Sequence, residues 1–181
     1  MAVSKKNILA ICGSTRKNSS NHSFIKAIAE LYYEELDIKI YEGIASLPHF
    51  NPDDDTDDPP ALVKDFRQQL KEADGILICT PEYAHGVVGT LKNAIDWTVS
   101  SGEFSHKPTI LITASTDGQA GHKALLETLR VIEAKDIDRL QLLVQFVKTR
   151  INKDHQITDE KTLSAVRELM RNFILTLQEQ E

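Results

Sequence analysis

The sequence predicts an α/β protein, a three-layer α/β/α sandwich built on a five-stranded parallel sheet in the order 2-1-3-4-5. Two observations carry this prediction. Short, continuous apolar segments alternate with longer segments of helical periodicity along the chain. Continuous apolar strands are typical of strands covered on both faces, so we expect a parallel sheet with helices on both sides.

The expected strands are the short apolar segments. The first is closed by Gly13 and the third by Pro81, residues that commonly end regular structure. The last alternates apolar and polar residues, which favours a strand with one wetter face. The five segments are 7–12, 38–41, 75–80, 109–114 and 140–147.

The expected helices follow the strands and carry apolar residues three or four positions apart. Thr158 is the expected N-cap of the last helix, with Asp159 and Glu160 favourable in its first turn. Residues 43–60 are dense in Pro, Asp and Asn and are expected to form a loop. The five helices are 23–36, 61–73, 87–99, 121–134 and 159–178.

Composition narrows the class of protein. The length of 181 residues suits one domain with a sizeable core, and we expect residues 1–181 to form it. The 27 acidic and 21 basic residues give a net charge of −6, which argues against nucleic acid binding. No apolar run approaches the roughly 20 residues that span a bilayer. We therefore expect a cytoplasmic protein without membrane contact.

Two cysteines, Cys12 and Cys79, fit a reducing compartment and make no zinc-binding spacing with the scattered histidines. They end strands expected to be neighbours. They are interpreted as small core residues, with a redox pair as the alternative. The acidic run 53–58 is interpreted as a solvated loop, with a cation site as the alternative.

The loop after the first strand reads GSTRKNSSN. It lies between a buried strand and a helix N-terminus, where unpaired backbone N–H groups and the helix dipole favour an anion. Arg16 adds a charged fork suited to a phosphate. The loop is neither a P-loop nor a Rossmann fingerprint. A polar turn with a Ser or Asn N-cap is the alternative, but Arg16 and the position after the first strand favour phosphate binding.

The loop after the third strand reads TPEYAHGVVGTLKNAIDW. In the predicted order the first and third strands are neighbours, so this loop and the first one flank one crevice. A phosphate at the first loop and a planar ring at the second describe a mononucleotide. Tyr83 offers an apolar face with a polar tip, and ordinary packing is the alternative. Trp97 is interpreted as a core residue or a subunit contact.

Together these loops resemble the NADPH-dependent FMN reductase family. GSTRKNSSN is similar to the family motif GSxRxxSxN, and PEYAHGVVGTLKNAIDW to its PEYNxxxPGxLKNAxDW signature. Shorter matches at LPHFNPD, KPTILITAS and GHKALLETLR extend the resemblance over about residues 7–143. The resemblance implies a flavodoxin-like fold, bound FMN and electrons from NAD(P)H. It also implies an acceptor such as free flavin, a quinone, an azo compound or a metal ion, ping-pong kinetics, and a homodimer or homotetramer.

The resemblance assigns residues as well. Three groups would contact FMN: Ser14, Arg16, Ser19, Ser20 and Asn21 at the phosphate; Pro81, Glu82, Tyr83 and Ala84 along the isoalloxazine; and Ser115, Asp117 and Gly118 at its other edge. No catalytic side chain and no metal is implied, because the flavin itself carries the chemistry. Ala84 and Val88 depart from the usual Asn and Pro of the motif, which leaves the acceptor preference open.

Alternatives remain open. One is a flavodoxin-type electron carrier without NAD(P)H activity, although its T/S-x-T-G-x-T loop pattern is absent; another is a flavin-free binding module on the same fold. The helix ending at Trp97 is the expected subunit interface, because Trp97 has no place in the inward stripe. NADPH selection would need basic residues near its 2′-phosphate. The candidates, each also explained as a surface residue, are Lys17, Lys107, His122 and Lys123.

Overall fold

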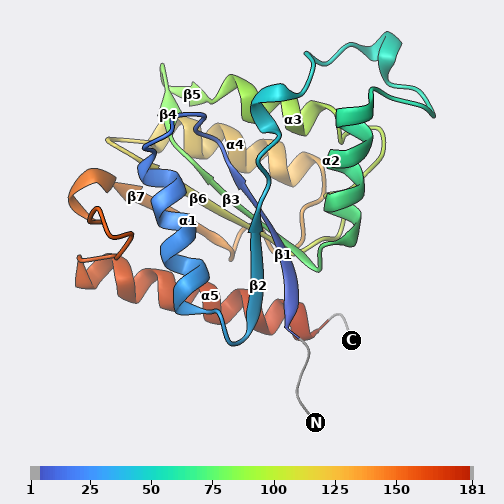
Figure 1. Ribbon diagram of the computed structural model, residues 1–181. Helices are drawn as coiled ribbons and strands as arrows, with labels where there is room; N and C mark the ends of the chain where they lie inside the picture. The colour runs from blue at the N-terminus through green and yellow to red at the C-terminus, as the bar shows by residue number, and fades with distance from the viewer. Residues whose placement is uncertain (1–4, 180–181) are drawn as a thin grey trace.

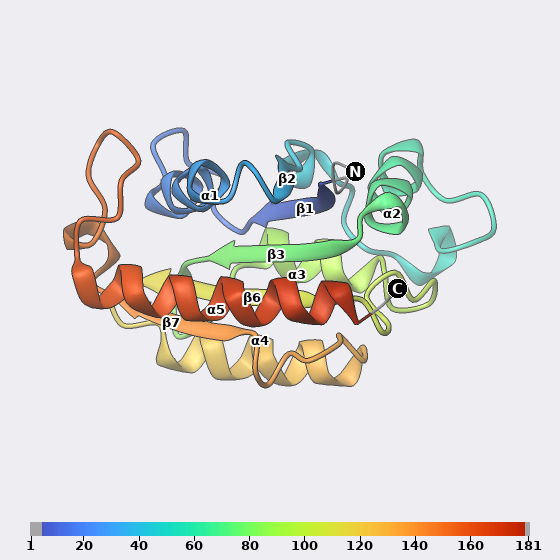
Figure 2. The ribbon, with the colours of Figure 1, turned by 90° about the horizontal axis from the view of Figure 1, so that it is seen from below.

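The computed structural model describes residues 5–179 and confirms the predicted architecture (Figures 1 and 2). Its main sheet is parallel throughout, in the order β2-β1-β3-β6-β7. This is the predicted order 2-1-3-4-5, because β4 and β5 form a separate small hairpin. The sheet strands are β1 Lys6–Cys12, β2 Leu36–Ile40, β3 Gly75–Thr80, β6 Thr109–Ser115 and β7 Gln141–Gln145.

Helices cover both faces of this sheet. One core joins α1 and α5 to the sheet, and the other joins α2, α3 and α4 to its opposite face. Ile76 and Ile78 of β3 enter one core, whereas Leu77 and Cys79 enter the other, so a continuous apolar strand serves both. The helices are α1 Ser20–Leu31, α2 Ala61–Glu72, α3 Gly89–Asp96, α4 Gln119–Val131 and α5 Glu160–Gln178.

The first helix begins three residues earlier than predicted and ends at Leu31 rather than at residue 36. Ser19 is its N-cap, because the Ser19 hydroxyl accepts a hydrogen bond from the Asn21 N–H at 3.2 Å. The serine pair that resembled part of a phosphate loop is therefore also the helix start. The N-terminus of α1 points toward the carboxyl ends of the strands, at the top of Figure 1.

A hairpin occupies the segment that was predicted as a loop before the third helix, and it extends into the first predicted helical residue, Val87. β4 Glu82–Tyr83 pairs antiparallel with β5 Gly86–Val87, and α3 starts only at Gly89. Ala84 and His85 at the tip have φ values of 49° and 56°. Two consecutive positive φ values are the requirement of a type I′ turn. The prediction missed the hairpin because such turns usually carry Asn, Asp or Gly, and this one does not.

The end of the fifth sheet strand also differs from the prediction. β7 stops at Gln145, and Phe146 adopts a φ of 53°, so the chain leaves the sheet and enters a short 3₁₀ turn, Val147–Thr149. Phe146 was expected to alternate inward with its neighbours. It is instead 57% exposed. Its side chain is thereby available at the carboxyl edge of the sheet.

The last helix is capped by Asp159, not by Thr158 as predicted. The Asp159 carboxylate accepts hydrogen bonds from the Thr162 N–H at 2.9 Å and from the Thr162 hydroxyl at 2.7 Å. A carboxylate at this position also opposes the positive end of the helix dipole. Among residues 5–179, no helix is both long enough and apolar enough to cross a lipid bilayer.

Trp97 is fully buried, so the expectation that it forms part of a subunit interface is wrong. Its indole N–H donates to the Pro48 carbonyl at 2.9 Å, and its ring packs edge-on against Phe50 with 5.0 Å between centroids. These contacts hold the 43–60 loop against the end of α3. The loop contains two short 3₁₀ turns, Ile44–Ser46 and Pro52–Asp54.

Asp55 in the acidic run is held by Arg67 of α2. Their side chains form an ion pair at 2.6 Å, and both are about nine-tenths buried. Arg67 also donates through Nε to the Trp97 carbonyl at 2.7 Å. The Arg67 guanidinium holds the pKa of the Asp55 carboxyl below its usual value. Asp55 is therefore a structural tether for the loop, not a free ligand for a cation.

Candidate active site

An open crevice of about 370 Å³ lies at the carboxyl ends of the sheet strands. It is bounded by the loop after β1, the loop after β3, the end of β6 and the turn after β7. Many of the predicted site residues meet here. The predicted residues that line the crevice are Ser14, Arg16, Ser20, Asn21, Pro81, Glu82, Tyr83 and Ser115.

The first wall is the turn from β1 into α1. The Gly13 N–H donates to the Cys79 carbonyl at 2.9 Å, so the turn starts pressed against the end of β3. Ser14 is buried, whereas Arg16 is exposed, and both line the crevice. The first turn of α1 presents backbone N–H groups that an α-helix leaves unpaired. This wall combines a helix N-terminus, hydroxyls and a guanidinium, which suits a phosphate.

Asn21 has a structural role that the sequence did not reveal. Its Nδ2 donates to the Ala114 carbonyl at 3.1 Å, and its Oδ1 accepts from the Cys79 thiol at 3.3 Å. The side chain therefore ties the first turn of α1 to both β3 and β6. Ser19, which was expected at the phosphate, caps α1 and does not line the crevice. Both residues position the first wall.

The second wall is formed by Pro81, Glu82 and Tyr83. The Glu82 carboxylate accepts from the Gly121 N–H at 2.6 Å, and the Glu82 N–H donates to the Ser115 hydroxyl at 3.4 Å. A Cβ on Gly121 would lie only 2.9 Å from the Gly86 carbonyl oxygen, so α4 and the hairpin are in close contact. Glu82 thus joins the hairpin to the N-terminus of α4. Tyr83 remains 49% exposed and offers its ring to the crevice.

Besides Ser19, three predicted residues lie outside the crevice lining. Ala84 is exposed at the hairpin tip. Asp117 accepts from the side-chain amides of Gln119 at 3.2 Å and Gln145 at 2.8 Å. Gly118 is the N-cap of α4 with a φ of 91°, a conformation that favours glycine. Asp117 and Gly118 therefore shape the loop that presents Ser115.

Sequence reasoning missed part of the site. Ala114 and Thr116 line the crevice beside Ser115, and the turn after β7 contributes the segment 146–149. No motif marks that segment in the sequence. The alternation of apolar and polar residues reaches into this segment, so residues 146 and 147 were predicted as part of the strand. Phe146, in its left-handed conformation, is the second exposed aromatic side chain of the crevice.

The two cysteines lie side by side beneath the site. Cys12 of β1 pairs with Cys79 of β3 in the sheet register, and both thiols are free and buried. Burial raises the pKa of both thiols, that of Cys79 strongly. Cys12 donates to the Ser14 carbonyl, and Cys79 donates to Asn21. Protonated, hydrogen-bonded thiols of this kind are core residues, as interpreted, and they hold the first wall in place.

Two candidates for NADPH selection are engaged elsewhere. Lys107, at the start of β6, donates to the carbonyls of Leu70, Lys71 and Ala73 at the end of α2, and burial lowers its pKa. The His122 ring contacts the Thr113 hydroxyl and the Gln141 side-chain oxygen, each at 2.8 Å. Neither residue lines the crevice.

Glu82, His85 and Asp117 bring potential metal-ligating atoms within 4.8 Å of one another. The carboxylates of Glu82 and Asp117 already accept the hydrogen bonds described above, and the His85 side chain is 81% exposed. Among residues 5–179, nothing beyond the closeness of these three side chains indicates a metal ion at this place.

The parallel strand order defines a flavodoxin-like fold, and the crevice lies beside the ends of β1 and β3, where such sheets bind their ligands. Residues 6–149 match the sequence profile of the NADPH-dependent FMN reductase family, and the chain belongs to this family. It is an oxidoreductase that uses FMN, with NAD(P)H as its co-substrate. The resemblance seen in the two loops is thereby confirmed.

Individual proteins agree with this assignment. The chain is 29% identical over 176 residues to an NAD(P)H-dependent FMN reductase of Pseudomonas aeruginosa, covering 94% of this chain and 92% of that protein. It is 36% identical over 121 residues to a quinone reductase of Pseudomonas putida, covering 65% and 64%. The fold matches that of FerB, a flavoenzyme NAD(P)H:(acceptor) oxidoreductase from Paracoccus denitrificans, with a TM-score of 0.78, 24% identity and coverage of 96% and 98%.

Proposed function

We propose that this enzyme reduces planar acceptors, quinones or free flavins, with FMN held in the crevice between the β1–α1 turn and the hairpin. The observation that carries the proposal is the convergence of a phosphate-type wall and a wall with exposed aromatic groups on one open crevice. The lining supports the fit to FMN, because the described residues of the first wall offer hydroxyls and a guanidinium to a phosphate and no carboxylate. Ser14, Arg16 and Ser20 would hold the phosphate.

The isoalloxazine would lie over Pro81, Glu82 and Tyr83, with Ser115 at its other edge. When bound, FMN supplies the transfer of electrons from NAD(P)H to the acceptor. The chain itself provides position and polarity. Glu82 fixes the hairpin against α4, and the N-terminus of α4 directs its dipole toward that edge of the crevice. No side chain is assigned as a general acid or base.

The acceptor class follows from the exposed aromatic rings. Tyr83 and Phe146 line the crevice from opposite loops and are 49% and 57% exposed. Exposed aromatic faces favour stacking with a planar molecule. A small oxyanion such as chromate gains nothing from them. Planar quinones and flavins are therefore the preferred acceptors of this proposal.

We also infer a homodimer or homotetramer in the cytoplasm. With Trp97 buried, the support for association is the open side of the crevice, where a second copy would complete the acceptor pocket. The two free thiols support a reducing compartment.

The test begins with the flavin content of the purified protein and anaerobic bleaching of its visible absorbance by NADPH or NADH. Turnover is then compared for a benzoquinone, free FMN, an azo dye and chromate. We expect quinone or flavin to be preferred, and Tyr83→Ala and Phe146→Ala to raise the KM for these acceptors more than the KM for chromate. A colourless protein that does not bind added FMN contradicts the proposal, as does bound flavin that neither nicotinamide bleaches.

A further inference from the structure

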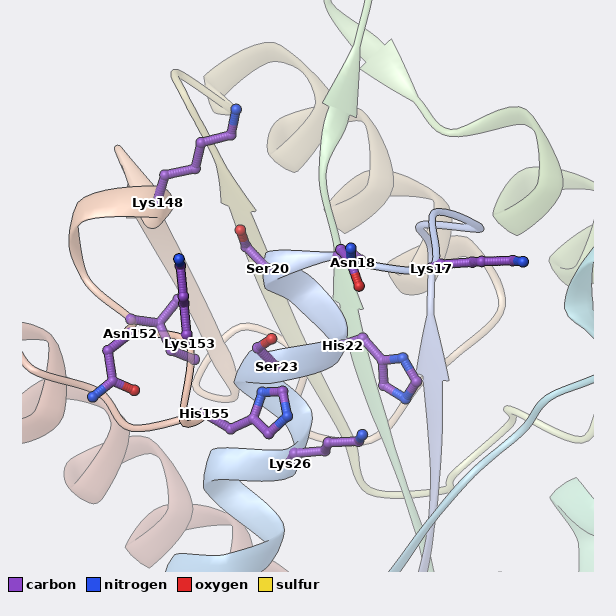
Figure 3. Close-up of a pocket in the computed structure, with 12 residues that line it drawn as sticks. Lys17, Asn18, Ser20, His22, Ser23, Lys26, Lys148, Asn152, Lys153 and His155 are labelled. Atoms are coloured by element: carbon purple, nitrogen blue, oxygen red, sulfur yellow. The ribbon is translucent and has the colours of Figure 1, made fainter.

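A second and larger hollow of about 670 Å³ adjoins the crevice. It lies between the start of α1 and the segment 148–155, which follows the turn after β7 (Figure 3). Ser20 and Lys148 line both spaces, so the two adjoin. The hollow therefore adjoins the wall assigned to the FMN phosphate, at the opposite side of that wall from the hairpin and its aromatic ring.

The hollow is strongly basic. Its lining residues include four lysines and two histidines and no Asp or Glu, although the chain has a net charge of −6. Figure 3 shows Lys148 and Lys153 on the 148–155 segment and Ser20 and Ser23 across from this segment on α1, with the Lys148 side chain extending toward the top of the view. Positive charge gathered opposite a helix N-terminus favours an anionic ligand.

The loop that forms the wall opposite α1 is held in place by its own hydrogen bonds. Ile151 and Ile157 form a β-bridge that closes the loop between them. Inside it, the Asn152 side-chain oxygen accepts from the backbone N–H groups of Asp154 at 3.0 Å and Gln156 at 2.9 Å. These bonds hold the loop tip at the hollow. A preorganised wall loses little freedom on binding.

His155 gives a second observation that points to a ligand. It has a φ of 59°, and its Nδ1 is enclosed without a hydrogen-bond partner among the described residues. In Figure 3 its ring lies beside Ser23 and Lys26 of α1. An enclosed, unpartnered nitrogen costs free energy unless a ligand or a water molecule satisfies it.

We propose that this hollow receives the adenosine monophosphate half of flavin adenine dinucleotide, so that the enzyme binds FAD as well as FMN. The inference rests on the proposed placement of FMN. FAD extends FMN from its phosphate, which is the end that adjoins the hollow. The lysines would hold the second phosphate, and a volume of 670 Å³ lies within the range of about 300–1,000 Å³ found for small-molecule sites.

The pyridine nucleotide is a poorer occupant of the hollow. NAD(P)H must bring its nicotinamide to the ring end of the crevice, between Tyr83 and Phe146, whereas the hollow opens beside Ser20. The test therefore includes NADPH and NADH as a separate arm. If substitutions in the hollow weaken the binding of NADPH alone, and not of NADH or FAD, the hollow binds the 2′-phosphate of NADPH and the proposal is overturned.

The test titrates flavin-free protein with FMN and with FAD and follows the quenching of flavin fluorescence. The variant is the double substitution Lys26→Glu and Lys153→Glu, two lysines that line the hollow and not the crevice. We expect the wild type to bind both flavins. In the variant, the Kd for FAD should rise about tenfold or more, with less than about threefold change for FMN.

The matched control is the pair Lys64→Glu and Lys161→Glu, which changes the charge equally at exposed positions outside the hollow and the crevice. It should leave the FAD-to-FMN ratio of Kd values unchanged. This inference is overturned if the hollow variant weakens the binding of both flavins equally, or if the wild type binds FMN but not FAD. Either result leaves the proposed function intact. If neither flavin binds the wild type, both fail. Thermal melting of each variant confirms that it is folded.

Discussion

Gly13 stands where β1 ends, directly against Thr80 at the end of β3. A Cβ built on Gly13 would lie 2.1 Å from Thr80 Oγ1 and 2.6 Å from Thr80 Cβ. The Gly13 N–H is bonded to the neighbouring strand, so the backbone cannot simply move away. The turn into the phosphate wall therefore requires glycine because of close approach, not because of its φ.

Replacing Gly13 with alanine should destabilise the protein by about 1–3 kcal/mol, the usual cost of overpacking. It should also weaken FMN binding, because the turn must move. Urea unfolding and a flavin titration measure the two effects. Gly89→Ala is the control, since a Cβ there meets nothing within 4 Å and alanine at the first residue of α3 should not destabilise the protein. Equal stability of the two variants would contradict this account.

His122 joins α4 to β6 and β7 in its neutral form. The Gln141 side-chain oxygen can only accept, so Nε2 carries the proton and the Thr113 hydroxyl donates to Nδ1. Burial lowers the pKa of His122 below its ordinary value of 6.5. The unfolded chain therefore takes up a proton at higher pH than the folded one does. Its contribution to stability is complete above pH 6.5 and is lost as the pH falls toward the folded pKa.

The corresponding prediction compares wild type with His122→Gln. The free energy of unfolding, measured by urea between about pH 5 and 8, should fall more steeply on acidification in the wild type. Above pH 6.5 the difference between the two proteins should be constant. Curves that stay parallel through the acidic range would show that His122 is not the group responsible.

At the scale of elements, the start of α5 lies one residue later than the sequence suggested, so Asp159 caps the helix in place of Thr158. Asp159 accepts from Thr162 and also pairs with Arg150 at 2.7 Å, whereas the Thr158 hydroxyl donates to the Arg150 carbonyl at 3.4 Å. The Thr162 hydroxyl and N–H hold the pKa of Asp159 below its usual value. The helix start therefore depends on a charged cap.

Asp159→Ala should lower the urea midpoint clearly, and Thr158→Ala should lower it little. The difference should begin to shrink as the pH falls below the ordinary Asp pKa of 3.8, and it should vanish only below the lowered pKa of folded Asp159, where the cap itself is protonated. Paired unfolding curves at neutral and acidic pH measure it. A larger loss from Thr158→Ala would restore the cap that the sequence suggested.

The elements that the sequence could not predict depend on unusual backbone or on distant partners. The β4–β5 hairpin turns through Ala84 and His85, which rarely adopt positive φ. Phe146 leaves the sheet in the same way. The role of Asn21 depends on Ala114 and Cys79, residues from two other strands that only the folded chain brings together.

At the scale of the whole molecule, the strand order and the place of the crevice could be predicted. Parallel βα units allow few topologies, and ligands bind where neighbouring connections diverge. The residues of the first two walls could be predicted for the same reason, because they come directly after the neighbouring strands β1 and β3. They include Ser14, Arg16, Pro81 and Tyr83. The turn after β7 also lines the crevice, but it could not be predicted, because it is distant in sequence from the other two loops and carries no motif.

The central claim is that the start of α1 binds the phosphate of a flavin. The most direct measurement compares FMN with riboflavin, which lacks only that phosphate, in titrations of the flavin-free wild type and of Arg16→Ala. We expect the wild type to bind FMN at least about a hundredfold more tightly than riboflavin. Arg16→Ala should raise the Kd for FMN about tenfold and leave the Kd for riboflavin nearly unchanged. Equal affinity of the wild type for the two flavins would contradict it.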